Sequence, residues 1–186
     1  MPAEIPFACD CGTVHGHLAL PNSHAGARVI CHCRDCRAGE IAQGRPDPGA
    51  EGVELYQTTP ERVVFDSGKD RLGLIRLSPK GLFRWHATCC GAPLFNTMPS
   101  PGFVFASLRT NRTPDPDALG PVVAHVNRPG GNTGLARVMA GILWRTLKAR
   151  IGGAAKRDPF FDDAGQPVSA PRVLTLEERR AATPAA

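Results

Sequence analysis

Up to about residue 108, the hydrophobic residues of this chain fall in short runs that alternate with polar positions and end at turn residues. In Thr13–Leu20, the apolar residues Val14, Leu18 and Leu20 occupy one side of an extended chain, and mainly polar or small residues occupy the other. This two-residue period is typical of a strand with one buried face. Further runs with the composition of strands are Arg28–Cys31, Val53–Thr58, Arg62–Phe65, Leu72–Leu77, Leu82–Ala87 and Phe103–Leu108. The pattern therefore predicts a mainly β fold.

The pattern changes after a proline-rich stretch at residues 113–116. Apolar residues then recur at helical spacing, at Leu135, Val138, Met139, Ile142, Leu143, Leu147 and Ile151. This spacing predicts a C-terminal α-helix over about residues 133–151, which Thr133 caps and Gly152 ends. Because basic residues also lie on it, a membrane-surface helix is one interpretation. We expect instead that the apolar stripe docks on the sheet or on a second subunit, which would make the protein a homo-oligomer.

The composition fits one domain of ordinary size with a tail. The chain has 186 residues, 42% of them hydrophobic, and its 20 glycines and 18 prolines favour short strands and many turns. We expect a body over residues 1–112 and a C-terminal extension over residues 113–186, which holds the helix and, from Ala154 onward, an extended arm. The net charge is +5, but residues 133–186 contribute most of it. The body is nearly neutral, so we expect neither a nucleic-acid surface nor a membrane partner.

Seven cysteines are the strongest chemical feature of the sequence. An odd number excludes complete disulfide pairing, and the N-terminal residues have neither the basic segment nor the apolar stretch of a signal peptide. We therefore expect a cytoplasmic protein, in which clustered cysteines are metal ligands or catalytic thiols. Thiolates held this close repel one another and lose hydration on burial unless a cation compensates, and zinc is the usual cation.

The cysteines form three groups in the sequence: Cys9 with Cys11, then Cys31, Cys33 and Cys36, and then Cys89 with Cys90. The first and third groups together supply four ligands, which predicts a closed structural zinc site. The middle group supplies three thiolates and leaves the fourth tetrahedral position open for a water molecule or a thiol. In the alternative interpretation, His32, Asp35 or a distant side chain fills that position and the second site is inert.

These motifs resemble those of the glutathione-dependent formaldehyde-activating enzymes, a zinc-binding family that also includes centromere-protein-V-like proteins. The resemblance covers about residues 5–110 and lies in Cys9-x-Cys11-Gly12, Cys31-His32-Cys33-x-x-Cys36-Arg37-x-Gly39 and Cys90-Gly91-x-Pro93-Leu94-Phe95. It implies a β-tent-like fold of antiparallel sheets around two zinc sites. It also implies that Cys31, Cys33 and Cys36 hold the catalytic zinc, and that Cys9, Cys11 and Cys90 are three of the four structural ligands.

The fourth structural ligand departs from the pattern of that family. The family places a cysteine three residues before the last one, which is position 87, where this chain has Ala87. Cys89 is the first candidate to replace it, although adjacent cysteines reach one metal only with a distorted backbone. Loss of the site is the second alternative, and ligation by His86 is the third.

The resemblance implies a carbon–sulfur lyase or synthase that acts on thiol–aldehyde adducts such as S-hydroxymethylglutathione. The small-molecule partners would then be a thiol such as glutathione and an aldehyde such as formaldehyde. The alternative function is a non-enzymatic zinc module, in which the metals hold the β-scaffold together and the C-terminal helix and arm bind a protein partner.

Overall fold

The computed structural model of the chain describes residues 4–20 and 24–184. The strands are β1 (Glu4–Ala8), β2 (His15–Ala19), β3 (Ala27–Cys31), β4 (Val53–Thr58), β5 (Val63–Ser67), β6 (Leu72–Arg76), β7 (Phe83–Ala87), β8 (Pro93–Thr97), β9 (Ala106–Arg109), β10 (Val122–Val126) and β11 (Pro171–Val173). The α-helices are α1 (Arg34–Ile41), α2 (Leu135–Ile151) and α3 (Leu176–Ala181). Within these residues, no helix has the length and hydropathy needed to cross a bilayer.

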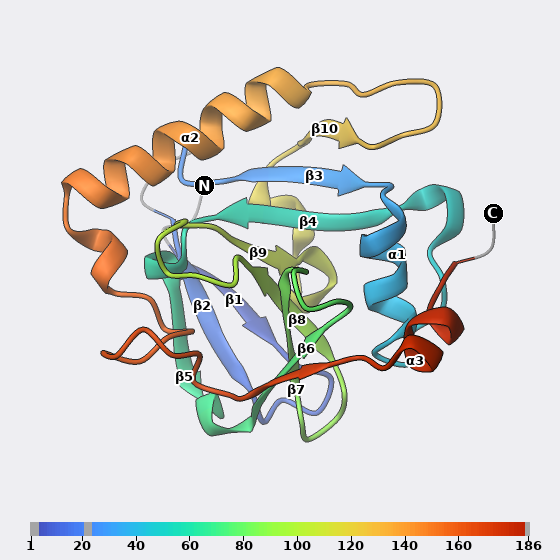
Figure 1. Cartoon of the computed structure of the whole chain (residues 1–186). Helices are drawn as coiled ribbons and strands as arrows, with labels where there is room; N and C mark the ends of the chain where they lie inside the picture. Colours follow the sequence, from blue (N-terminus) through green and yellow to red (C-terminus); the bar gives the residue numbers. More distant parts are fainter. Residues whose placement is uncertain (1–3, 21–23, 185–186) are drawn as a thin grey trace.

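The strands form two sheets (Figure 1). The small sheet has the order β1-β2-β5, and both of its pairings are antiparallel. The large sheet has the order β10-β3-β4-β9-β8-β7-β6-β11. Its inner pairings are antiparallel, whereas its two edge pairings, β10 with β3 and β11 with β6, are parallel. The predicted mainly β fold with a C-terminal helix is confirmed. The two parallel edge pairings were not predicted.

Aromatic side chains fill the space between the two sheets. Phe7 of β1 meets Phe95 of β8 edge to face, with ring centroids 5.0 Å apart. The fully buried Phe160, from the segment after α2, lies 5.1 Å from Trp85 and 5.3 Å from Phe95 between ring centroids. The segment after α2 therefore belongs to the core, although the sequence predicted an extended arm there. The division of the chain at residue 112 stays a prediction.

Each of the predicted strands overlaps an observed strand, but several elements were not predicted. The additional strands are β1, β8, β10 and β11, and the additional helices are α1 and α3. Proline within or at the start of a segment, as in β1 and β8, weakens the strand pattern because proline donates no ladder hydrogen bond. The edge strand β11 is exposed along its whole length, so its sequence has no apolar alternation.

The start and the packing of α2 differ from the prediction. Gly134, in a left-handed conformation with φ 68°, precedes the first helical residue, and no side chain caps the helix. Thr133 instead pairs with His125 of β10 through two backbone hydrogen bonds of 2.9 and 3.2 Å. Of the predicted apolar stripe, only Val138 and Ile142 are buried against the sheet. The stripe as a whole therefore does not dock on the sheet, and the other alternative, docking on a second subunit, stays a prediction.

Candidate metal centres

Two loops from different sheets bring four cysteines together. Cys9 and Cys11 lie in the loop between β1 and β2, and Cys89 and Cys90 lie in the turn between β7 and β8. Their sulfur atoms all lie within 4.8 Å of one another. The Cys9 sulfur is 3.5 Å from that of Cys11 and 3.8 Å from that of Cys89. This four-cysteine cluster can hold a metal ion, and it joins the small sheet to the large one.

Tight backbone turns form both halves of the four-cysteine cluster, and one of them directs an amide at a sulfur atom. The Cys9 amide donates to the Val14 carbonyl at 2.8 Å, and the Val14 amide donates in return to the Cys9 sulfur at 3.3 Å. Gly12 has φ +75°, which closes this tight loop at a conformation that glycine favours. In the opposite turn, Gly91 has φ +72° and its amide donates to the Ala87 carbonyl at 2.8 Å. Cys89 and Cys90 can thus both lie in one cluster because Gly91, directly after them, adopts the left-handed conformation that the turn needs.

Three further cysteines meet where β3 runs into α1. Cys31 ends β3, Cys33 is the N-cap residue of α1, and Cys36 lies in the first turn of that helix. Their sulfur atoms lie within 4.8 Å of one another, and no fourth histidine, cysteine or carboxylate among residues 4–20 and 24–184 joins the group. The Cys36 amide donates to the Cys33 sulfur at 3.3 Å, and the Asn127 side-chain amide donates to the Cys31 sulfur at 3.7 Å. We call this the three-cysteine cluster.

The pKa values of both clusters indicate a place for a cation. Hydrogen bonding with Cys33 holds the pKa of Cys31 far below its ordinary value, while the Cys31 sulfur raises the pKa of Cys33 and, more strongly, of Cys36. In the other cluster, hydrogen bonding with Thr13 lowers the pKa of Cys11 to about 6, and Cys11 raises that of Cys89 to about 12. One thiol therefore ionises at the expense of its neighbours. Full ionisation of either set needs a positive ion, so the donor sets fit a thiophilic metal.

Buried arginines surround the three-cysteine cluster on the sheet side of α1. Arg84 of β7 donates to the Asp35 carbonyl at 2.7 Å, and Arg109 of β9 forms an ion pair of 2.9 Å with the buried Glu40. Arg109 also interacts electrostatically with Cys36. Two arginines and one glutamate leave an excess of one positive charge. That excess would offset the single negative charge of three thiolates around a divalent cation.

The other residues named from the sequence lie outside the clusters. His32 faces His125 across a stacked ring pair, with its Nε2 atom 3.2 Å from His125 Nδ1. His86 is half-buried in β7 and does not belong to the group of four thiols. Asp35 is exposed and also lies outside the three-cysteine cluster. All seven cysteines are free thiols.

Sequence reasoning missed several residues that surround the three-cysteine cluster, namely Glu40, Arg84, Arg109 and Asn127. An arginine inside the apolar run of β7 was a usable signal, because a charged residue in a buried strand needs a partner. Nothing in the sequence pointed to Asn127. It is the single non-glycine residue with positive φ (54°) in the described part of the chain.

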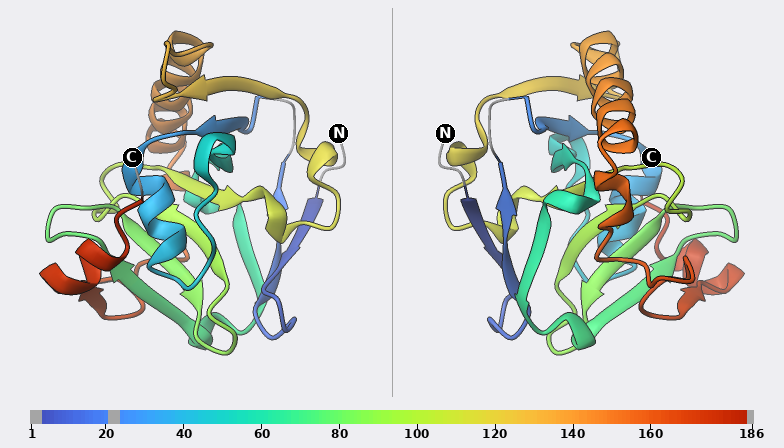
Figure 2. Two further views of the ribbon diagram at one scale, coloured as in Figure 1. Left: turned by 90° about the vertical axis from the view of Figure 1, so that its right-hand side faces the viewer. Right: turned by 90° about the vertical axis from the view of Figure 1, so that its left-hand side faces the viewer.

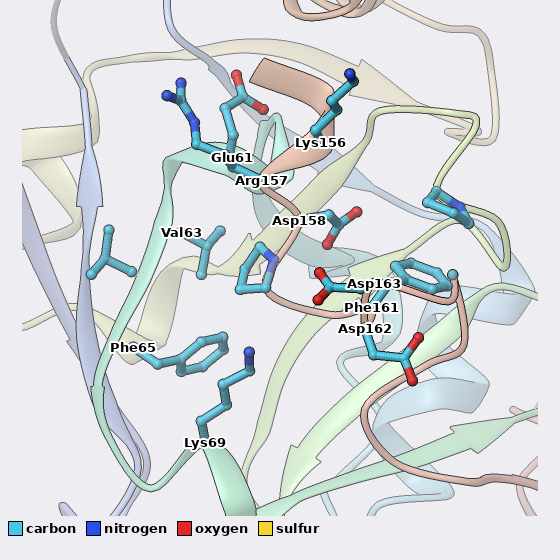
Figure 3. Close-up of a pocket in the computed structure, with 14 residues that line it drawn as sticks. Glu61, Val63, Phe65, Lys69, Lys156, Arg157, Asp158, Phe161, Asp162 and Asp163 are labelled. Carbon is cyan, nitrogen blue, oxygen red and sulfur yellow. The ribbon is translucent and has the colours of Figure 1, made fainter. Parts of the chain in front are cut away.

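A cavity of about 800 Å³ lies between the β5 region and the segment after α2 (Figure 3). Its lining includes Glu61, Phe65, Lys69 and Asp158 but no cysteine. Burial raises the pKa of Asp158 to about 6, although the Phe160 amide donates to its carboxylate at 2.9 Å. This cavity is therefore separate from the residues that can hold a metal.

The fold and the two clusters define a class of protein: a mainly β chain with two groups of thiols that can each hold a metal ion. The chain belongs to DUF6151, a family of unknown function whose profile matches residues 1–124. No curated protein matches the sequence. Among solved structures, it is similar to the crystal structure of a Rhodobacter sphaeroides protein, with 19% identity and a TM-score of 0.45 over 63% of this chain and 97% of the other. A likeness at that level carries no inference about this chain.

Proposed function

We propose that both clusters hold zinc, that the four-cysteine site is structural and that the three-cysteine site is catalytic. The observation that carries the proposal is the division of seven cysteines into a group of four and a group of three. Tetrahedral zinc with sulfur ligands at about 2.3 Å places neighbouring sulfurs about 3.8 Å apart. The observed separations of 3.3 to 3.8 Å within the clusters are close to that value.

The proposed reaction is the making or breaking of a carbon–sulfur bond in a thiol–aldehyde adduct such as S-hydroxymethylglutathione. The resemblance of the cysteine motifs to formaldehyde-activating enzymes supports this choice, and the three-ligand cluster supports an open position. Zinc bound there would lower the pKa of a thiol at that position, so that the thiol adds to an aldehyde as a thiolate. The reverse reaction releases the thiolate and the aldehyde.

The chain's own residues would orient and balance this site. The Asn127 amide holds the Cys31 sulfur, and the Cys36 amide at the start of α1 holds the Cys33 sulfur. The ring nitrogens of His32 and His125 lie 3.2 Å apart, and burial together with His125 and Arg128 lowers the pKa of His32, which favours its neutral form. The lining of a cavity of about 530 Å³ beside α1 includes Glu40, Arg45 and Arg109 but no cysteine, so this cavity is not the place where a thiol would meet the metal.

Zinc analysis of the purified protein is the first test. We expect two zinc ions per wild-type chain after reconstitution under reducing conditions, and one per chain in Cys36→Ser and in Cys89→Ser. Retention of two ions by Cys89→Ser would show that this residue is not a ligand. Absence of zinc from the reconstituted wild type would refute the proposal.

Turnover separates the two sites. With glutathione and ¹³C-formaldehyde, nuclear magnetic resonance follows the rate at which the adduct forms and decays above the uncatalysed rate. We expect Cys36→Ser to abolish the catalysed rate while circular dichroism still shows a folded protein. If the fully zinc-loaded wild type shows only the uncatalysed rate, the two metal sites remain supported but the proposed enzyme activity is refuted.

A non-enzymatic zinc module that binds a protein partner is the second candidate function. The specific observation in its favour is that α2 exposes most of its apolar side chains. In that case Cys33→Ser or Cys36→Ser would unfold the protein, and no thiol-dependent turnover would be found in the wild type.

A further inference from the structure

The outer face of α2 is apolar and open to solvent. Figure 1 shows this helix lying along the outside of the molecule over β10, β3 and β4, and in Figure 2 it stands out from the body at one end. The large side chains on this face are Met139 (46% exposed), Leu143 (59%), Trp144 (60%), Leu147 (50%) and Ile151 (79%). We call these five residues the outer face of α2. An apolar group of this kind on one face of a helix marks a site of interaction.

The opposite side of the same helix fixes it to the protein. Val138, Ile142 and Ala149 are buried. The Thr146 hydroxyl donates to the Val104 carbonyl at 3.1 Å. The outer face is therefore held outward by a docked inner face, and the helix does not need to turn over to present it.

The charge around the outer face has one sign. Residues 118–157 contain seven lysines and arginines and no aspartate or glutamate. Arg137 and Lys148 lie seven residues before and four residues after Trp144, which places all three on one side of the helix. No ion pair among the described residues involves a basic residue of α2. The charge therefore fits an anionic partner.

A second copy of this chain fits the face poorly. Two outer faces packed together would bring two sets of lysines and arginines into one interface without a carboxylate between them. The 17-residue helix is about 26 Å long and about 10 Å wide, so its exposed half offers roughly 400 Å² of surface per copy. Stable protein interfaces bury about 800 Å² on each partner.

We propose that the outer face of α2 binds the surface of membranes that contain anionic phospholipids. The apolar side chains would enter the boundary between headgroups and acyl chains, and Arg137 and Lys148 would meet the phosphates. Trp144 lies between the apolar and the basic residues, the position that tryptophan takes at a membrane interface. This binding is independent of the chemistry proposed for the cysteines, and it replaces the expectation from sequence that no membrane is involved.

Vesicle binding by the full chain tests the proposal. We expect the protein to co-sediment with vesicles of equal parts phosphatidylglycerol and phosphatidylcholine, and to stay in solution with pure phosphatidylcholine. Tryptophan fluorescence gives a second readout, because Trp144 is exposed whereas Trp85 is fully buried. Binding should shift the emission to the blue, and brominated lipids should quench the part that Trp144→Phe removes.

Matched variants separate the outer face from the rest of the surface. Leu143→Glu combined with Leu147→Glu should reduce vesicle binding by more than tenfold, and both positions are exposed, so the fold should be kept. Leu176→Glu, on the even more exposed leucine of α3 (73%), should leave binding unchanged. Arg137→Gln and Lys148→Gln should each weaken binding to anionic vesicles about fivefold at low salt.

Four results would overturn the proposal. The first is no binding to anionic vesicles at low salt, and the second is binding that the double glutamate variant keeps. The third is a dimer in light scattering that the double glutamate variant abolishes, which would assign the face to a second copy. Capture of an acidic protein segment by a chain that ignores vesicles would assign it to a protein partner.

Discussion

Asn127 connects β10 to the three-cysteine cluster through both its backbone and its side chain. Its φ of 54° is left-handed, a conformation that costs most residues about 1 kcal/mol and that asparagine tolerates better. Its backbone amide donates to the Asn132 side chain at 2.6 Å, and its side-chain amide donates to the Cys31 sulfur. The left-handed backbone thus aims a hydrogen-bond donor at a thiolate.

We predict that Asn127→Gly lowers the zinc affinity of the three-cysteine cluster about tenfold, because residues that hold metal ligands typically contribute that much. Glycine keeps the left-handed backbone and removes only the donor. Asn127→Ala should show the same loss of affinity and, in addition, lose about 1 kcal/mol of stability through backbone strain. A competition titration with a chromophoric chelator measures the affinity, and urea unfolding measures the stability. Wild-type affinity in Asn127→Gly would show that the contact with Cys31 does not support the metal.

Among the elements, α1 is unusual because its side toward the sheet is polar. Its Glu40 faces Arg109 of the sheet, and Gly39 lets the helix approach Arg84, since a Cβ at position 39 would come within 2.5 Å of the Arg84 guanidinium. Burial lowers the pKa of Arg109, and the carboxylate of Glu40 opposes that shift. The helix that carries Cys36 is therefore positioned by buried charges.

We predict that breaking the pair of Glu40 and Arg109 costs about 3 kcal/mol for either single variant, Glu40→Leu or Arg109→Met, because each leaves a buried charge without its partner. The double variant should cost clearly less than the sum of the two. The exposed pair of Asp70 and Arg71, 3.4 Å apart, is the control, and Asp70→Asn should change the free energy of unfolding by less than about 1 kcal/mol. Urea unfolding of the variants provides these values. Additive losses would mean that the two buried groups do not stabilise each other.

Whether the buried side of an element is apolar or polar explains which elements could be predicted from the sequence. The apolar alternation of β4 and the helical spacing of α2 are local patterns, and both were predicted close to their observed bounds. The helix α1 has no apolar period, because its buried side carries glutamate, glycine and cysteine, so no pattern indicated it.

The cysteines were grouped correctly in space because short loops hold the members of each group together, and only the pairing of the first and third groups needed a long-range guess. Their role as zinc ligands stays a proposal. The residues that surround the three-cysteine cluster come from β7, β9 and β10, which are separated in sequence by tens of residues. Their positions depend on which strands pair and in what register, and local sequence patterns do not reveal the pairing of strands so far apart in the chain.

In the whole molecule, the C-terminal extension (residues 113–186) contributes to the same sheet and the same core as the body (residues 1–112). The extension supplies β10 to the large sheet, and the segment after α2 supplies Phe160 to the core. Asp158 lies two residues before Phe160, and its carboxylate accepts the amide of that residue. The charge of this aspartate therefore bears on how the extension packs against the body.

We predict that Asp158→Asn makes the protein more resistant to unfolding at pH 7.5 than the wild type, but has less effect at pH 5. Burial raises the pKa of Asp158 to about 6 in the folded protein, above the ordinary value of 3.8 for an aspartate. The stability contributed by its protonated form is thus complete below pH 3.8 and is lost as the pH rises through about 6. Asparagine keeps the oxygen that accepts the Phe160 amide and carries no charge, so this loss does not occur in the variant.

Between pH 5 and pH 7.5, the difference in the free energy of unfolding between variant and wild type should grow by about 1 kcal/mol. Urea unfolding at fixed salt measures it, and staying above pH 5 limits the protonation of cysteine ligands, which the wild type and the variant share. Asp162→Asn is the control, because Asp162 is an exposed carboxylate that lines the same cavity. A difference that stays constant with pH in Asp158→Asn, or that grows equally in Asp162→Asn, would show that the Asp158 carboxylate is ionised near its ordinary pKa. The carboxylate would then be well solvated, and the attachment of the segment after α2 to the core would depend on its buried aromatic side chains, Phe160 and Phe161.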